Sequence, residues 1–201
     1  MKENELERWD RHGGNPGGGG CTGRPHRASF MKKPKIYRNT IMQIGFLTWH
    51  LDTAMKYWNE YFGFEPSEIS VTLPYEQTHA VYNGQPCYGR NRTAYYNFDN
   101  VQMEIIEPYG EEPSYWRECL ERNGEGFHHI ALQVKNTDAC IQHLVDTGMG
   151  EFKMKGEFPG GVFQEQTFSG GRYSYVDTKE KLGFIAEFLE LDTEDDEEEE
   201  Q

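Results

Sequence analysis

Two hydrophobic periodicities alternate along the middle of the chain, and the same order of periodicities occurs twice. In the first copy, an apolar run over residues 41–48 predicts a buried strand. A helical pattern follows, which we expect Asp52 or Thr53 to cap and Gly63 to end. The inner face of this helix is expected to hold Met55, Trp58, Tyr61 and Phe62. Strand-like stretches then follow near residues 67–73, 78–83, 92–98 and 101–107.

The second copy begins with another apolar run over residues 127–134. Thr137 is expected to cap the next helix and Gly148 to end it. Its inner face is expected to hold Ile141, Leu144 and Val145. Strand-like stretches follow near residues 151–158, 162–168, 171–177 and 183–190. The pattern predicts an α+β fold of two β-α-β-β-β repeats, over about residues 40–108 and 126–191.

The segments outside the repeats have other compositions. Residues 113–123 predict a helix that joins the two copies and carries its apolar residues along one side. Residues 1–35 are rich in glycine and proline and have no periodicity, so we expect a flexible arm. Residues 192–201 form an acidic run that predicts a disordered tail. One domain over residues 36–191 therefore remains.

Charge and cysteine content exclude several classes of protein. The net charge is −14, and residues 36–191 alone carry 22 acidic against 12 basic residues, which disfavours nucleic acid as a partner. No apolar run is long enough to span a membrane, and no secretory signal is evident. The four cysteines form no C-x-x-C pair, which argues against a thiolate zinc site and suggests a cytoplasmic location.

Equivalent positions in the two copies carry polar residues inside apolar strands. Gln43 and His129 lie in the first strand of each copy, 20 and 19 residues before the glycine that ends the helix. Glu104 and Glu187 lie in the last strand, 41 and 39 residues after that glycine. Two buried carboxylates that converge repel each other unless a cation lies between them. If the copies pack about a pseudo-twofold axis, these four residues supply three oxygen ligands and one nitrogen ligand to a divalent metal.

The duplicated pattern resembles the vicinal oxygen chelate superfamily, which includes glyoxalase I, methylmalonyl-CoA epimerase and extradiol dioxygenases. The resemblance covers roughly residues 40–191, and residues 124–131 are most similar to the epimerase and glyoxalase-like members. It implies a glyoxalase-like fold with a cupped mixed sheet, and a homodimer. It further implies one divalent ion per chain (Mn²⁺, Co²⁺, Ni²⁺, Zn²⁺ or Mg²⁺), bound by Gln43, Glu104, His129 and Glu187.

The four positions match some members better than others. Methylmalonyl-CoA epimerases typically have His and Gln where this chain has Gln43 and Glu104. Eukaryotic-type glyoxalase I typically has Gln, Glu, His and Glu, which matches all four positions. Extradiol dioxygenases need two histidines and a carboxylate for iron, and only His129 is available here.

The resemblance implies a metal-dependent isomerase, an epimerase or racemase, that removes a proton next to a carbonyl through a metal-stabilised enolate. Glu104 and Glu187 would be the catalytic acid and base, one on each face of the intermediate. Many aromatic residues in the middle strands favour a flat, flavonoid-like ketone as the small-molecule substrate, with a methylmalonyl-CoA-like ester as another possibility. A glyoxalase I-type lactoylglutathione lyase and a non-catalytic small-molecule binding protein are the alternatives.

Each candidate residue also has a structural interpretation. Gln43 and His129 are compatible with buried residues that bond to the backbone. Glu104 can instead pair with Arg90 or Arg92 at a strand edge, and Glu187 with Lys179 or Lys181. Because strand residues alternate between faces, His128 is expected to face away from His129 and to be structural.

Overall fold

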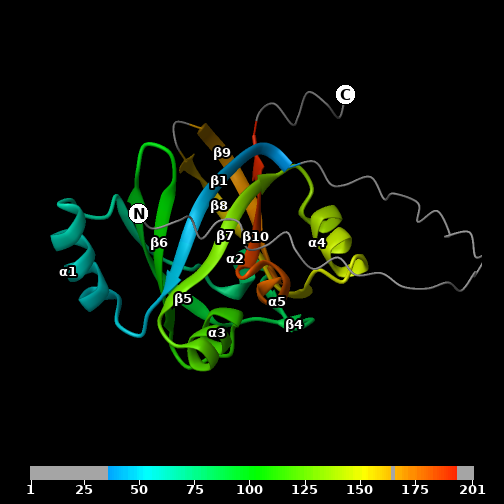
Figure 1. The fold of residues 1–201 in the computed structure, drawn as a ribbon, viewed down its shortest axis with the longest axis horizontal. Coiled ribbons are helices and arrows are strands. Elements are labelled where there is room, and N and C mark those ends of the chain that lie inside the picture. Colours follow the sequence, from blue (N-terminus) through cyan, green and yellow to red (C-terminus); the bar gives the residue numbers. More distant parts are fainter. Residues whose placement is uncertain (1–35, 164–165, 194–201) are drawn as a thin grey trace, which may run out of the picture. The chain divides into compact units, whose positions relative to one another are not determined.

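The first strands of the two repeats lie side by side at the centre of one sheet (Figure 1). The computed structural model describes residues 36–163 and 166–193. β1 (Ile36–Leu47) pairs antiparallel with β7 (Gly126–Val134), with Gly45 opposite His129. The described residues form a ten-stranded sheet in the order β2-β5-β6-β1-β7-β10-β9-β8-β3-β4. The junction between the repeats is therefore a direct pairing of their first strands.

The two halves have the same internal order. The first half contains α1 (Leu51–Phe62), β2 (Glu68–Val71), β5 (Arg90–Asn97) and β6 (Gln102–Tyr109). The second half contains α4 (Thr137–Asp146), β8 (Glu151–Phe163), β9 (Gln166–Asp177), α5 (Lys179–Leu182) and β10 (Ile185–Asp192). In each half the last strand pairs parallel with the first, as β6 does with β1 and β10 with β7. The predicted α+β fold with a strongly curved mixed sheet is confirmed.

A short segment of the first half crosses to the other half. It contains α2 (Tyr75–Thr78), β3 (Val81–Tyr82) and β4 (Gln85–Pro86). β3 pairs with β8 of the second half, with Tyr82 opposite Met154. The stretch predicted as a strand near residues 78–83 thus extends the second half, and the two repeats are not fully symmetric.

A β-bulge lies in β1 next to the junction. Ile41 and Gln43 face Leu132 and Ala131, which are consecutive residues of β7, so Met42 is an extra residue on β1. Met42 and Gln43 consequently both line the same cavity instead of facing opposite sides of the sheet.

A second bulge lies at the pseudo-equivalent place in β7. Phe127 and His129 face Phe46 and Gly45, which are consecutive in β1, so His128 is the extra residue. Each bulge directly precedes the polar residue that the repeat predicts for the metal site. The duplication therefore preserves a local irregularity as well as the regular elements.

The N-caps of the two helices differ from the predicted ones by one to three residues. α1 begins at Leu51, and the side chain of its N-cap residue His50 makes no capping hydrogen bond, so neither Asp52 nor Thr53 is the cap. In α4, Asn136 accepts a hydrogen bond from the Ala139 backbone and takes the place predicted for Thr137. Two residues predicted on inner helix faces are exposed instead: Tyr61 of α1 and Val145 of α4.

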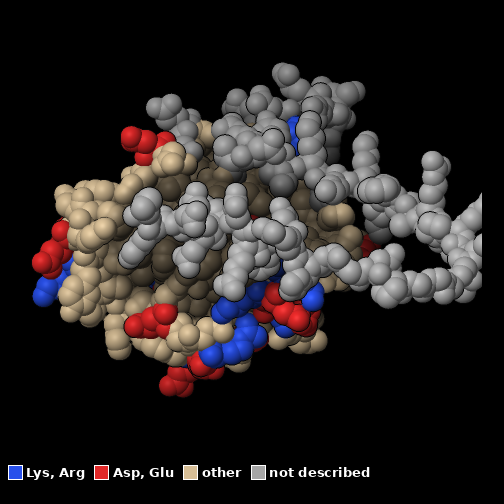
Figure 2. Space-filling model, in the orientation of Figure 1, with Lys and Arg blue, Asp and Glu red and all other residues tan. Residues whose placement is uncertain are grey.

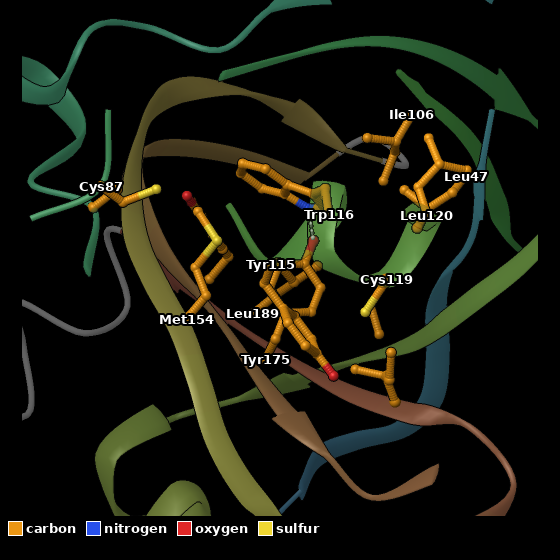
Figure 3. Packing of buried hydrophobic residues seen from close by; sticks show 14 of the residues in the cluster. Leu47, Cys87, Ile106, Tyr115, Trp116, Cys119, Leu120, Met154, Tyr175 and Leu189 are labelled. Carbon is orange, nitrogen blue, oxygen red and sulfur yellow. Dashed lines mark hydrogen bonds between the residues drawn. The ribbon is translucent and has the colours of Figure 1, made fainter. Parts of the chain in front are cut away.

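The linking helix α3 (Tyr115–Asn123) carries large side chains into the concave side of the sheet. Its apolar side is buried as predicted: Tyr115, Trp116, Cys119 and Leu120. Figure 3 shows these residues packed against side chains of several strands, and Trp116 Nε1 donates a hydrogen bond to Tyr175 Oη at 3.2 Å. Helix α3 thus closes the core of the concave side.

The predicted arm over residues 1–35 lies outside the described residues, as do residues 194–201 of the predicted tail. Asp192, the first residue of the predicted tail, is instead the last residue of β10. Within the described part of the chain, no helix is both long and apolar enough to cross a membrane.

Candidate metal centre

The four residues predicted from the repeat converge at the centre of the sheet. They lie on four neighbouring strands, Glu104 on β6, Gln43 on β1, His129 on β7 and Glu187 on β10. His129 Nε2 is 2.9 Å from Glu187 Oε2 and 3.4 Å from Glu104 Oε2. Gln43 Nε2 donates a 2.6 Å hydrogen bond to Glu104 Oε1. One ligand atom from each of Glu104, His129 and Glu187 lies within 4.8 Å of the others, so this cluster can hold a metal ion.

Burial and mutual charge determine the ionisation of the cluster. Burial raises the pKa of Glu104, the interaction with His129 lowers it, and the charge of Glu187 raises it. Burial lowers the pKa of His129, but the two carboxylates outweigh burial and raise this pKa to about 10. In the metal-free protein the imidazole is therefore an imidazolium that neutralises part of the carboxylate charge.

Two buried atoms of the cluster indicate that a cation fits between them. His129 Nε2 and Glu187 Oε2 are buried and lie 2.9 Å apart as an ion pair, but neither atom makes a hydrogen bond to a described group. Buried polar atoms without a hydrogen bond are rare, because desolvation of such atoms is costly. A divalent cation with nitrogen and carboxylate ligands would satisfy both atoms, so the donor set fits the metal that the fold family implies.

Gln43 has a different position in the cluster from the other three residues. Its amide nitrogen faces the cluster and donates to Gln102 Oε1 as well as to Glu104 Oε1, at 2.7 Å and 2.6 Å. A rotation of this amide would be needed to present its oxygen to a cation. The sequence interpretation missed Gln102, although it lies two residues before Glu104 and therefore on the same face of β6.

The alternative ion pairs for the two glutamates do not form. Arg92 pairs with Asp52 and Glu107, and Arg90 Nε donates to the Thr72 carbonyl. Lys181 pairs with its neighbour Glu180. Within the described part of the chain, the ion pairs of Glu104 and Glu187 are both with His129.

His128 does not face away from His129, and this part of the prediction is wrong. The two Nδ1 atoms are 2.9 Å apart, and both rings contact Tyr175, with centroid distances of 5.5 and 5.4 Å. The bulge in β7 interrupts the alternation of side chains and turns both histidines to the same side. Burial lowers the pKa of His128 well below its ordinary value, and the charge of His129 lowers it further. His128 is therefore neutral at physiological pH.

A cavity of about 410 Å³ opens beside the cluster, and Gln43, Glu104 and Glu187 line it. Seven of its lining residues are aromatic: Tyr95, Trp116, Phe158, Phe163, Phe168, Tyr173 and Tyr175. The charged residues that line it are all carboxylates: Glu68, Glu104, Glu157 and Glu187. An adjoining hollow includes Arg172, but this guanidinium pairs with Glu190 at 2.6 Å. The cavity thus offers apolar surface and negative charge, with no cation among its described lining residues.

Basic side chains elsewhere are also accompanied by acidic ones. On the face shown in Figure 2, Lys and Arg side chains lie next to Asp and Glu side chains instead of forming a basic patch. Arg122, for example, pairs with both Glu118 and Asp177.

A family model described as the glyoxalase/bleomycin resistance protein/dioxygenase superfamily matches residues 42–161. This chain therefore belongs to that superfamily, and the resemblance to vicinal oxygen chelate proteins is confirmed. Among curated proteins, none has a sequence that matches this chain.

The chain is similar to several solved structures, of which the first below shows the same fold. Hypothetical protein BH1468 from Bacillus halodurans C-125 is 19% identical, with a TM-score of 0.50 and coverage of 75% of this chain and 93% of that one. A variant of Streptomyces coelicolor methylmalonyl-CoA epimerase in complex with 2-nitronate-propionyl-CoA is 22% identical, with a TM-score of 0.47 and coverage of 75% and 93%. Methylmalonyl-CoA epimerase from Mycobacterium tuberculosis is 16% identical, with a TM-score of 0.47 and coverage of 76% and 87%.

Proposed function

We propose that this protein is a metal-dependent epimerase or racemase that acts at a carbon next to the carbonyl of an uncharged aromatic ketone. The observation that carries this proposal is the convergence of Glu104 and Glu187 on His129 from opposite halves of the chain. Gln43, Glu104, His129 and Glu187 would hold one divalent cation, which would stabilise negative charge that develops on substrate oxygens. The homodimer implied by the family stays a prediction.

The two glutamates would move the proton. One carboxylate would take the proton from the carbon, and the other would return a proton to the opposite face. This assignment is supported by their origin on β6 and β10, on opposite sides of the central strand pair. The aromatic walls would exclude water from the reacting carbon.

The lining of the cavity supports an uncharged substrate. Coenzyme A esters carry several negative charges and glutathione adducts carry two carboxylates, which the cavity carboxylates would repel. A flat ketone with aromatic rings would instead bury its surface against side chains such as Trp116 and Tyr175. We therefore favour this substrate class over a methylmalonyl-CoA-like ester.

A lactoylglutathione lyase of the glyoxalase I type is the second candidate. The order Gln43, Glu104, His129 and Glu187 matches the ligand order typical of eukaryotic-type glyoxalase I. The absence of cationic side chains among the described lining residues argues against glutathione.

The first experiment measures bound metal by elemental mass spectrometry on the full chain purified without added metal, beside His129→Ala. We expect about one divalent ion per wild-type chain and none in the variant. Circular dichroism checks that the variant is folded, and Glu187→Gln repeats the test with a side chain of the same size. Absence of metal from wild-type protein, even after loading with Mn²⁺, Co²⁺, Ni²⁺ and Zn²⁺, would contradict the proposal.

The second experiment follows loss of optical rotation and uptake of solvent deuterium by chiral α-aryl ketones. Uptake of solvent deuterium and loss of optical rotation, without conversion to another compound, supports an epimerase or racemase. Turnover of the methylglyoxal–glutathione hemithioacetal would instead identify the lyase. Saturable ligand binding without either reaction would identify a binding protein.

A further inference from the structure

We infer that His128 is a positioning residue of the metal centre, which holds His129 in the tautomer with its proton on Nδ1 and leaves Nε2 free for the cation. This inference rests on the metal site proposed above.

The contact between the two rings carries the inference. His128 Nδ1 and His129 Nδ1 are 2.9 Å apart, a distance at which two ring nitrogens share one hydrogen bond. His129 Nε2 lies on the other side of its ring, between Glu104 and Glu187. If Nε2 gives its lone pair to a cation, the neutral ring must carry its proton on Nδ1. His128 is then the acceptor for that proton.

The burial of His128 has an energetic cost that its contact with His129 would explain. The side chain is 4% exposed, and its Nε2 has no hydrogen-bond partner among the described residues. An apolar side chain would avoid that unsatisfied atom in the same space between Tyr115 and Tyr175. Packing alone therefore disfavours histidine at this position. The contact between His128 Nδ1 and His129 Nδ1 supplies a reason for a histidine here.

The pseudo-symmetry of the fold provides an internal comparison. The extra residue of the equivalent bulge in β1 is Met42, which precedes Gln43 and packs in the apolar core. Gln43 has no ring tautomer to select, and the residue before it has no ring nitrogen. His129 does have a tautomer to select, and His128 offers a ring nitrogen. The same backbone irregularity thus carries a hydrogen-bonding residue only where the candidate ligand is an imidazole.

The orientation of the His129 ring is limited by its other neighbours. A Cβ at Gly45 would lie 2.0 Å from His129 Cε1, so the imidazole lies directly against the β1 backbone. Tyr175 contacts the ring as well. These contacts restrict the plane of the ring, and His128 determines which nitrogen carries the proton.

The test compares wild-type full-length protein with His128→Met and His128→Gln. Met is the side chain of the equivalent position in the other half, and Gln keeps an acceptor near the His129 proton. Two-bond ¹H–¹⁵N correlation spectra of Zn²⁺-loaded protein report the tautomer of His129. Competition with a chelator reports the affinity for Co²⁺ and Zn²⁺, and circular dichroism with urea unfolding reports the fold.

We expect the Nδ1–H tautomer in Zn²⁺-loaded wild-type protein. We expect His128→Met to weaken metal binding by about 10- to 100-fold, and His128→Gln to recover a substantial part of that loss. A structural role alone would not make Gln better than Met in metal affinity, because Met is the better core residue.

The outcomes separate this inference from the proposed function. A wild-type protein that binds no cation removes the metal site and this inference together. A wild-type protein that binds a cation while His128→Met binds it equally well overturns this inference alone. If His128→Met does not fold, the wild-type spectrum decides, because a proton on His129 Nε2 with Zn²⁺ bound through Nδ1 would contradict the inference.

Discussion

The position of His129 depends on the absence of a side chain opposite it. Gly45 faces His129 across the β1–β7 pair, and the imidazole occupies the space that a Cβ would take. His129 is fully buried and lies between two carboxylates. Gly45 does not adopt a positive φ, so its backbone conformation does not require glycine. Glycine is required here because the His129 ring approaches the β1 backbone closely.

We predict that Gly45→Ala displaces the His129 ring and disrupts the metal centre. Overpacking in a strand core typically costs about 1–3 kcal/mol, so the urea midpoint of the metal-free protein should fall. The affinity for Co²⁺ should fall as well, because the ring can no longer keep its present position beside Glu187.

Gly170→Ala is the matched control on another strand of the same sheet. The nearest atom to a Cβ there is the flexible carboxylate of Asp192, at 3.2 Å. This variant should leave the affinity for Co²⁺ unchanged. An unchanged affinity in Gly45→Ala too would show that His129 tolerates displacement.

The raised pKa of His129 predicts a pH dependence of stability in the metal-free protein. The pKa is about 10 in the folded state against an ordinary value of 6.5, so the folded state binds more protons between these values. The stabilisation is fully present below about pH 6.5 and is lost as the pH rises through about 10. Urea unfolding in the presence of a chelator should show a midpoint that falls from pH 7 to pH 10.

His129→Gln lacks the titrating group and should show a smaller slope over the same pH range, whatever its absolute stability. Equal slopes in the two proteins would mean that another group causes the pH dependence. The raised pKa of Glu104 acts in the same direction, because ionisation of a buried carboxyl is unfavourable.

At the scale of the elements, α3 brings aromatic side chains to the concave side of the sheet and depends on its N-cap. Ser114 accepts a hydrogen bond from the Arg117 backbone and is 2% exposed. We predict that Ser114→Ala lowers the free energy of unfolding by about 0.5–2 kcal/mol, because it leaves a helix N–H without its partner. Urea unfolding at constant m-value measures this loss.

Ser67→Ala is the control for that prediction. The Ser67 hydroxyl donates to the Tyr95 carbonyl at an exposed position, where water replaces the lost partner. The change in the free energy of unfolding caused by Ser67→Ala should be close to zero. A loss in Ser67→Ala as large as in Ser114→Ala would argue against a capping role for Ser114.

The regular elements could be predicted from sequence because they follow local periodicity. The apolar runs at residues 41–48 and 127–134 both lie in the central strands, and Gly63 follows α1 in the left-handed conformation. The convergence of Glu104 and Glu187 also followed from the pattern, because equivalent positions of a duplicated unit meet at a pseudo-twofold axis.

The remaining features depend on pairings between distant segments. The bulge at His128 is defined only against the register of β1, so strand alternation misplaced this residue. The transfer of β3 to the edge of β8 joins residues more than 70 positions apart, and no local pattern encodes it. The role of Gln102 depends on its position opposite Gln43 in the parallel β1–β6 pair.

At the scale of the whole molecule, the two halves contribute to the sheet in equivalent ways, but they line the cavity differently. The hairpin of β8 and β9 supplies Phe158, Phe163 and Phe168, whereas β2 and β5 of the first half supply smaller polar residues such as Ser70 and Thr93. An aromatic substrate would therefore meet an apolar wall on one side and hydroxyl groups on the other.

The four proposed ligands of the candidate metal centre are divided equally between the halves: Gln43 and Glu104 lie before α3, and His129 and Glu187 after it. Residues 110–112 between them are exposed. A protease site engineered there should allow the backbone to be cut while the β1–β7 and β3–β8 pairs hold the two pieces together. The cation would then hold the two pieces together without a covalent bond. Its concentration would control the rate at which the pieces exchange with isotope-labelled copies, and native mass spectrometry would measure this rate. An exchange rate that ignores the cation would mean that one piece holds it alone.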